Sequence, residues 1–81
     1  MKVEQFHTTN QFILRGEGVT IFQSYASIIA RKDANGITLD VNKWDYSKTT
    51  GKYRNLFLGE TKVETQKKID AGIYKLADLN A

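Results

Sequence analysis

An Asn-Gly dipeptide at positions 35 and 36 constrains the fold of this chain more than any other feature, because Asn-Gly is the strongest short-range signal for a β-hairpin. Asn35 and Gly36 both accept the positive φ angles that a type I′ turn requires. After the dipeptide, apolar and polar residues alternate over positions 37–42, which is typical of a half-buried strand. We therefore expect residues 26–32 and 37–42 to form an antiparallel hairpin.

Three more strands are expected upstream of this hairpin. Residues 3–8 and 11–15 have the short mixed pattern of paired strands. Gly16-Glu17-Gly18 then forms a turn, because glycine tolerates positive φ. Residues 19–25 alternate with apolar groups on both faces, which suits a strand in a central position.

Helical spacing replaces this alternation after residue 46. Ser47 or Thr49 can accept a backbone N–H and so cap the start of a helix. Tyr53, Leu56 and Phe57 then recur at positions i, i+3 and i+4, which predicts that they form the buried face of that helix.

A second helix follows after Gly59, which fits just past the end of the first helix, where a left-handed residue is favoured. Thr61 and Glu64 match a capping box, and the helix is expected to run to about Ala71. Residues 73–79 are expected to close the domain as a final strand or an extended tail. The inward stripe of the second helix is expected to consist of Val63, Gln66, Ile69 and Ile73.

These elements predict an α+β fold: an antiparallel sheet of four to five strands, followed by two short helices packed on one face and a final extended segment. The chain has 81 residues, no proline and no internal repeat, so residues 1–81 are expected to form a single domain. Residues 1–20 are interpreted as a more variable N-terminal hairpin within it.

The sequence contains no constellation that is typical of catalysis or metal binding. There is no cysteine, and His7 is the only histidine, so neither a thiolate site nor a histidine cluster can form. A nucleophile elbow and a phosphate-binding glycine loop are both missing. Glu60 and Glu64 lie one helical turn apart, but neighbouring lysines favour a solvated helix face over a general acid–base pair. We therefore expect no catalytic residues, no cofactor and no metal, and a chain that is not an enzyme.

The charge of the chain lies entirely in its second half. Residues 1–40 carry no net charge, whereas residues 41–81 carry the whole formal charge of +3. A basic half can face nucleic acid or an acidic protein surface, although lysines that simply solvate the helices would give the same pattern. No stretch approaches the length of a membrane span and no signal peptide is recognisable, so we expect a cytoplasmic protein that does not bind membranes.

One segment, residues 44–54, combines the only tryptophan with two tyrosines and three cations. Aromatic residues with cations are favoured at protein-binding hot spots, and they also stack on bases and hold phosphates. The alternative is structural: Trp44 and Tyr46 cover the sheet while Ser47 and the threonines cap the helix. The expected partner-binding residues, in this segment and on the second helix, are Trp44, Tyr46, Lys48, Lys52, Tyr53, Arg54, Lys67 and Lys68.

The same segment resembles a small domain that tailed bacteriophages encode. The resemblance rests on the run Trp44-Asp45-Tyr46-Ser47-Lys48-Thr49-Thr50, on Lys52-Tyr53-Arg54 and on Phe57-Leu58-Gly59, and it extends over about residues 20–79. That family has no known function. The resemblance therefore implies a phage origin and the cytoplasm of an infected bacterial host, but no activity and no catalytic residues.

With this origin, we expect an interaction protein that inhibits or modulates a host or anti-phage defence protein, for which an anti-CRISPR type of inhibitor is one form. A domain of this size can present a standard interface of about 800 Å². Two alternatives stay open: a nucleic-acid-binding accessory protein that uses the helix cations, and a virion assembly component that self-associates, for instance as a homodimer.

Overall fold

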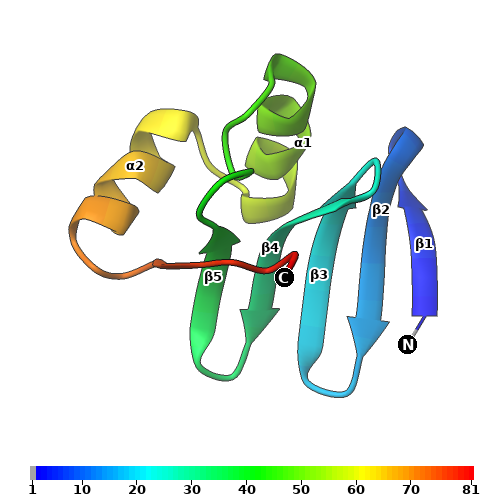
Figure 1. The fold of residues 1–81 in the computed structure, drawn as a ribbon, viewed down its shortest axis with the longest axis horizontal. Helices are drawn as coiled ribbons and strands as arrows, with labels where there is room; N and C mark the ends of the chain where they lie inside the picture. The colour runs from blue at the N-terminus through cyan, green and yellow to red at the C-terminus, as the bar shows by residue number, and fades with distance from the viewer. Residues whose placement is uncertain (1) are drawn as a thin grey trace.

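Six strands form one sheet in which the order in space is the order in sequence, and Figure 1 labels the first five of them. The structure, a computed structural model, describes residues 2–81. The first five strands pair antiparallel, and the short sixth strand pairs parallel to the fifth. The strands are β1 (Lys2–Phe6), β2 (Thr8–Gly16), β3 (Val19–Ser24), β4 (Ser27–Asp33), β5 (Gly36–Asp40) and β6 (Lys75–Ala77).

Two helices, α1 (Lys48–Leu58) and α2 (Lys62–Asp70), lie in the connection between β5 and β6. The α+β class is therefore confirmed. The sheet has one strand more than expected, because part of the final extended segment pairs with β5 as β6. Both expected helix starts are also confirmed: the Ser47 hydroxyl accepts from the backbone N–H of Thr50, and Thr61 and Glu64 form the capping box.

The β4–β5 hairpin forms as expected, but its turn is not of type I′. Ala34 and Asn35 occupy the turn, Asp33 pairs with Gly36, and of these residues only Gly36 has positive φ (111°). The backbone N–H of Asn35 donates to Oδ1 of Asp33 (2.8 Å). This bond lets Asn35 keep an ordinary φ, so that only glycine takes the left-handed conformation.

Strand β5 ends at Asp40, two residues earlier than expected, because the buried side chain of Asp40 bends the chain away from the sheet. Its Oδ2 accepts from the N–H of Asn42 (3.1 Å), and its backbone oxygen accepts from the N–H of Trp44 (3.0 Å). Its Oδ1 accepts from the N–H of Leu79 (2.8 Å) and so holds the C-terminal segment. Val41, which was expected in the strand, is exposed in the turn that results.

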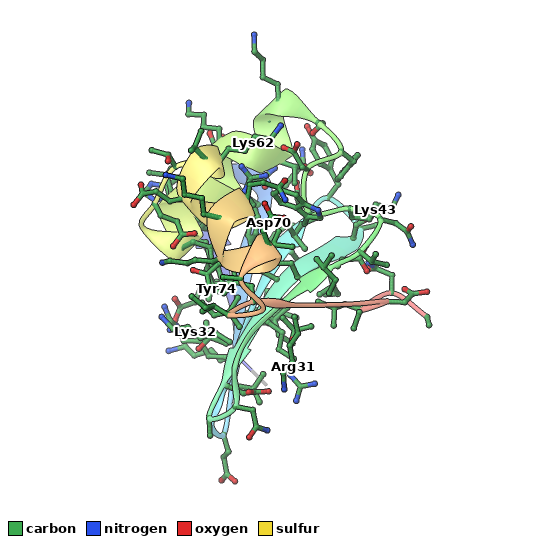
Figure 2. All side chains as sticks on the ribbon, turned by 90° about the vertical axis from the view of Figure 1, so that its left-hand side faces the viewer. Arg31, Lys32, Lys43, Lys62, Asp70 and Tyr74 are labelled. Atoms are coloured by element: carbon green, nitrogen blue, oxygen red, sulfur yellow. The ribbon has the colours of Figure 1, made fainter. Side chains whose placement is uncertain are left out.

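The two faces of the sheet have different surroundings. On one face, Ile13, Phe22, Ala30 and Leu39 are paired across neighbouring strands, and all four are buried in the core. Figure 2 views the sheet from its edge: the helices lie on the side of Lys32 and Tyr74, whereas Arg31 points to the other side. The helices therefore cover one face only, as the sequence predicted.

Each helix turns only part of its expected face toward the sheet. In α2, Ile69 packs against the core as expected, but Val63, Gln66 and the following Ile73 are exposed and Thr65 is the buried residue, so most of the expected stripe is wrong. In α1, Tyr53 and Phe57 pack against the core as expected, but Leu56 is 50% exposed, whereas Thr50 and Arg54 are fully buried. The polar residues can be buried because other buried groups satisfy their hydrogen bonds. For example, the hydroxyl of Thr50 forms a hydrogen bond with the hydroxyl of Ser24 (3.0 Å).

Gly51 lies inside α1, and we expect Gly51→Ala to raise the free energy of unfolding by about 0.5–1 kcal/mol. A methyl group there would lie 3.6 Å from the guanidinium of Arg54 and 3.7 Å from Oδ1 of Asp45, which are ordinary contact distances. Urea denaturation followed by the fluorescence of Trp44 measures the change. A loss of stability would mean that the helix packs more tightly at this point than these distances indicate.

Candidate functional site

The segment 44–54, which the sequence singled out, forms the loop before α1 and the first two turns of that helix. Trp44 is half-buried and packs against the core, whereas Tyr46 is 45% exposed. The ammonium of Lys43 lies 5.0 Å from the centre of the Tyr46 ring. Of the two aromatic residues in the loop, Tyr46 is therefore the one that a partner can reach.

Arg54 was expected on the surface, but the structure places it inside, with 1% of its surface exposed. Its Nη1 donates to the backbone oxygen of Trp44 (2.7 Å) and to Oδ1 of Asp45 (3.0 Å), and its Nη2 donates to Oδ1 of Asn55 (2.9 Å). The guanidinium also lies 5.1 Å from the centre of the Trp44 ring. Arg54 thus holds the loop against α1 and is not itself available for contact.

Asp45 connects this buried arginine to the start of α2. Its Oδ2 lies 2.6 Å from Nζ of Lys62, while its Oδ1 accepts from Arg54. Partial burial by itself raises the pKa of Asp45, but the hydrogen bonds and charges of Lys62 and Arg54 outweigh that effect and hold the pKa below its ordinary value. Asp45 is therefore ionised at neutral pH and bridges the two helices.

A shallow groove of about 660 Å³ follows the outer side of α1 around this bridge. On the side of α1 that borders it, Lys48, Lys52 and Leu56 are exposed and recur at helical spacing, whereas Gly51 and Arg54 are buried beneath them. Four cations and a single carboxylate line the groove, so its charge is positive. The lining residues are Asp45, Ser47, Lys48, Gly51, Lys52, Arg54, Asn55, Leu56 and Lys62.

Tyr53 points away from the groove, into an aromatic cluster beneath α1. Its ring lies 6.3 Å from the ring of His7 in a stacked arrangement and 6.5 Å from that of Phe6, which in turn contacts Phe22. Tyr53 is half-buried, and Lys52 lies over its outer side at 5.4 Å from the ring centre. Tyr53 therefore joins the N-terminal hairpin to α1, and the lone histidine is part of this packing.

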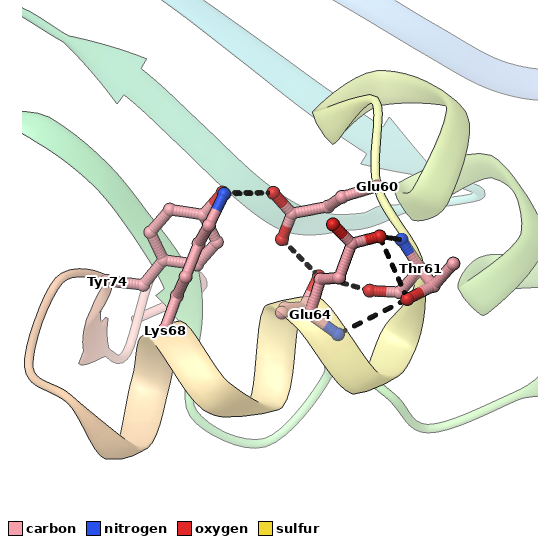
Figure 3. A network of polar contacts seen from close by, with 6 residues as sticks. Glu60, Thr61, Glu64, Lys68 and Tyr74 are labelled. Atoms are coloured by element: carbon pink, nitrogen blue, oxygen red, sulfur yellow. Dashed lines mark hydrogen bonds and ion pairs between the residues drawn. The ribbon is translucent and has the colours of Figure 1, made fainter.

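The two expected cations of α2 have different surroundings. Lys67 is exposed and does not line the groove. Lys68 is held in a network around Glu60, whose side chain is only 5% exposed (Figure 3). The Nζ of Lys68 and the hydroxyl of Tyr74 each donate to Oε1 of Glu60 at 2.7 Å, and the hydroxyl of Thr65 donates to Oε2 at 2.6 Å.

This network shifts the pKa of each titratable member. Burial raises the pKa of Glu60, but the hydrogen bonds from Lys68, Thr65 and Tyr74 outweigh it and keep that pKa below its ordinary value. The same carboxylate raises the pKa of Lys68, while burial and then Glu60 raise the pKa of Tyr74. The network ties the loop between the helices to the start of β6, so its role is structural.

The structure thus brings three of the eight predicted residues, Lys48, Lys52 and Arg54, together in one groove. It also adds Lys62 and Leu56, which sequence reasoning did not select. Lys62 follows Thr61, the N-terminal cap of α2, and only the packing of α2 beside α1 brings it near Lys52. Leu56 was missed because its spacing with Tyr53 and Phe57 indicated burial.

Among residues 2–81, no group of three or more histidine, cysteine or acidic side chains lies close enough to hold a metal ion. Neither of the described helices is long and apolar enough to cross a bilayer.

Comparison with known proteins gave one match. The model of the Family of unknown function (DUF8033) matches residues 1–72, which include the N-terminal hairpin, both helices and all of the groove. No curated protein and no solved structure matches the chain.

Proposed function

The chain belongs to the family of unknown function DUF8033, and we propose that it is a binding protein that holds an acidic segment of a partner protein in the groove beside α1. The observation that carries this proposal is the charge of the groove, where Lys48, Lys52 and Lys62 are exposed and the only carboxylate, that of Asp45, is balanced by the buried Arg54. A concave surface with fixed charges of one sign attracts and orients an oppositely charged partner.

The rigidity of the groove also supports binding. Arg54 and Asp45 form its floor, and both are held by hydrogen bonds to the loop and to the helices. The backbone of the lysines is already ordered in the helices, so binding a partner has to order only their side chains. The exposed Leu56 provides an apolar contact among these charges, and such mixed surfaces are typical of protein partners.

A protein partner is favoured over nucleic acid because of the surroundings of the aromatic residues at the site. Trp44 and Tyr53 are half-buried, which leaves Tyr46 as the exposed aromatic residue of the segment, whereas single-stranded nucleic acid is typically bound on several stacking rings. Binding of nucleic acid through Lys48, Lys52, Lys62 and Lys67 is the second candidate, and the experiment below separates the two.

In finer terms, we propose a phage-encoded inhibitor or modulator of a host or anti-phage defence protein that acts in the cytoplasm of the infected bacterium without catalysis. An inhibitor of the anti-CRISPR type is one such protein. The support is the resemblance of residues 44–59 to a domain of tailed phages, together with a small cationic surface that can cover an acidic site on another protein.

The groove is tested by reversing two of its charges with Lys48→Glu and Lys52→Glu in one variant. Both lysines are exposed in the first turns of α1, where glutamate is well tolerated because of the helix dipole. The variant and the wild type are used as baits in bacterial lysate, with and without nuclease, and the retained proteins are identified by mass spectrometry. We expect the wild type to retain a discrete protein after nuclease treatment, and we expect that protein to bind the variant about tenfold or more weakly.

The matched control reverses two exposed lysines outside the groove, Lys32→Glu and Lys75→Glu, which changes the net charge by the same amount. The control should retain the partner as the wild type does. Equal losses in both variants would show that net charge and not the groove decides binding. Retention that disappears with nuclease, and that weakens steeply with salt, would assign the site to nucleic acid.

A further inference from the structure

The face of the sheet that the helices do not cover is unusually apolar. Two cross-strand rows run over it: Val3, Leu14, Ile21 and Arg31 in one, and Gln5, Phe12, Gln23 and Ile28 in the other. An antiparallel sheet with one solvated face normally carries polar residues there. We name this surface the open sheet face, and its large apolar residues are Val3, Phe12, Leu14, Val19, Ile21 and Ile28.

None of these six side chains belongs to the buried core, and Val3 is 59% exposed. The C-terminal segment covers only a part of the face: Leu79 lies beside Val19 and Ile28, with a hollow of about 280 Å³ between them. Contiguous apolar patches of this kind mark interaction sites in proteins that are otherwise well solvated.

We propose that the open sheet face binds the same face of a second copy of this chain, so that the protein is a dimer with two sheets packed against each other. The charge pattern favours this partner. On β1, β2 and β3 the charged residues Lys2, Glu4 and Arg15 all lie on the helix-covered face, which leaves that part of the open face uncharged. Arg31 of β4 does lie on the open face, at the border of the apolar residues and of the hollow, where it is paired with Asp33 (3.2 Å). Two copies can therefore meet over β1, β2 and β3 without bringing like charges together, although each copy carries a net charge of +3.

Size and shape fit the same partner. The chain measures 31 × 28 × 25 Å, and in Figure 1 the sheet is seen broadside with the helices filling the rest of the outline, so the open sheet face approaches but does not exceed the ~800 Å² that each partner contributes to a standard interface. Twisted sheets pack face to face at a spacing of about 10 Å, with their side chains interdigitated. The hollow beside Leu79 gives a side chain of the second copy a place to insert.

Contact between sheet edges is a poorer route to a dimer. The free edge of β1 has two charged residues, Lys2 and Glu4, and an irregular register between Gln5 and Phe6. The other edge is β6, which has only three residues. Charges, irregular pairing and short strands are the features that keep an edge from pairing with another chain. The open sheet face is therefore a better surface for a second copy than the edges at β1 and β6.

The dimer goes beyond the function proposed above, because it uses the side of the sheet opposite to the groove. In such a dimer, the two grooves would lie on the two outer sides of the assembly and could bind two partner molecules. Each surface is tested separately, since substitutions on the open sheet face leave Lys48, Lys52 and Lys62 unchanged.

The oligomeric state is measured by sedimentation for the wild type and for two variants, Leu14→Lys and Ile21→Lys. We expect a wild-type dimer at high micromolar concentration. Each lysine occurs twice in a symmetric interface and is unpaired there, so each variant should dissociate about a hundredfold more readily. The matched controls, Leu56→Lys and Val63→Lys, add the same charge at exposed apolar positions on the helices and should stay dimeric.

A second measurement needs no substitution on the face. In a wild-type sample mixed from two isotope labels, nuclear Overhauser effects between chains should join methyl groups of Val3, Leu14, Ile21 and Ile28. A wild type that stays monomeric at these concentrations would overturn the proposal. So would folded lysine variants that remain dimeric, or contacts between chains that involve the helices or the sheet edges instead.

Discussion

Arg54→Met is expected to lower the free energy of unfolding by about 2–3 kcal/mol, a large part of the stability of a domain this small. The substitution removes the donors to the backbone oxygen of Trp44, to Asp45 and to Asn55, and it leaves the first of these without a partner in a half-buried place. We expect less than the full cost of breaking a buried ion pair, because Nε of Arg54 has no partner among the described residues and Asp45 keeps its contact with Lys62.

The fluorescence of Trp44 during urea denaturation measures this change, and it must be recorded at one protein concentration because a dimer would link stability to concentration. Lys52→Met is the matched control: it removes an exposed cation from the same helix and should change stability by no more than about 0.5 kcal/mol. Equal midpoints for Arg54→Met and the wild type would contradict the role of Arg54 as the link between loop and helix.

Glu60→Gln is expected to cost about 2–3 kcal/mol, because one carboxylate accepts hydrogen bonds from Thr65, Lys68 and Tyr74. A glutamine accepts with one oxygen only and is uncharged, so Lys68 loses its charged partner whichever way the amide turns. An amide N–H₂ at Oε1 would also remove the acceptor of Tyr74, whereas at Oε2 it would leave Thr65 with only the backbone oxygen of Thr61 as acceptor (3.1 Å). Glu64→Gln is the matched control, since glutamine also completes a capping box and this residue is exposed. A cost for Glu64→Gln equal to that for Glu60→Gln would mean that the network adds nothing beyond helix capping.

The same network predicts how stability depends on pH. The pKa of Glu60 is lower in the folded chain than its ordinary value, so its contribution is complete above the ordinary carboxyl pKa and is lost as the pH falls through the folded pKa. Between neutral pH and about pH 3, the wild type should therefore lose more stability than Glu60→Gln does. Asp45, whose pKa is also lowered, remains in both proteins, so part of the acid sensitivity should persist in the variant. Parallel losses would show that Glu60 is not the group that titrates.

The functional site was predictable in part. The lysines at positions 48 and 52 were selected because they stand beside aromatic residues, and the structure places both in the groove. Arg54 was selected for the same reason, yet it is buried. Composition cannot distinguish exposed lysines from a buried arginine, because a cation on a helix is buried only where other parts of the chain supply hydrogen-bond acceptors. For Arg54 these acceptors are the backbone oxygen of Trp44 and the carboxylate of Asp45.

The sequence pattern was also insufficient to predict that one face of the sheet is left without helices. Alternation in residues 19–25 indicated apolar groups on both sides of β3, and this was taken as the mark of a central strand. Strand β3 is indeed central, but the chain has only two helices, and both lie on one side. The second apolar face is therefore left to the C-terminal segment and, as we propose, to another copy of the chain.

The sequence by itself determined the elements whose causes are local. The hairpin at Asn35-Gly36, the caps of both helices at Ser47 and Thr61, and the α+β order of the elements all follow from neighbours within a few residues. The tertiary structure alone decided that Thr50, Arg54 and Thr65 also turn inward. Their polar groups are buried because side chains and backbone of other segments satisfy them: Ser24 of β3 for Thr50, the loop before α1 for Arg54, and Glu60 of the loop between the helices for Thr65. It also decided that Lys62 joins Lys52 in one groove. Burial of polar groups depends on such side-chain hydrogen bonds, and a pattern of hydrophobicity does not contain them.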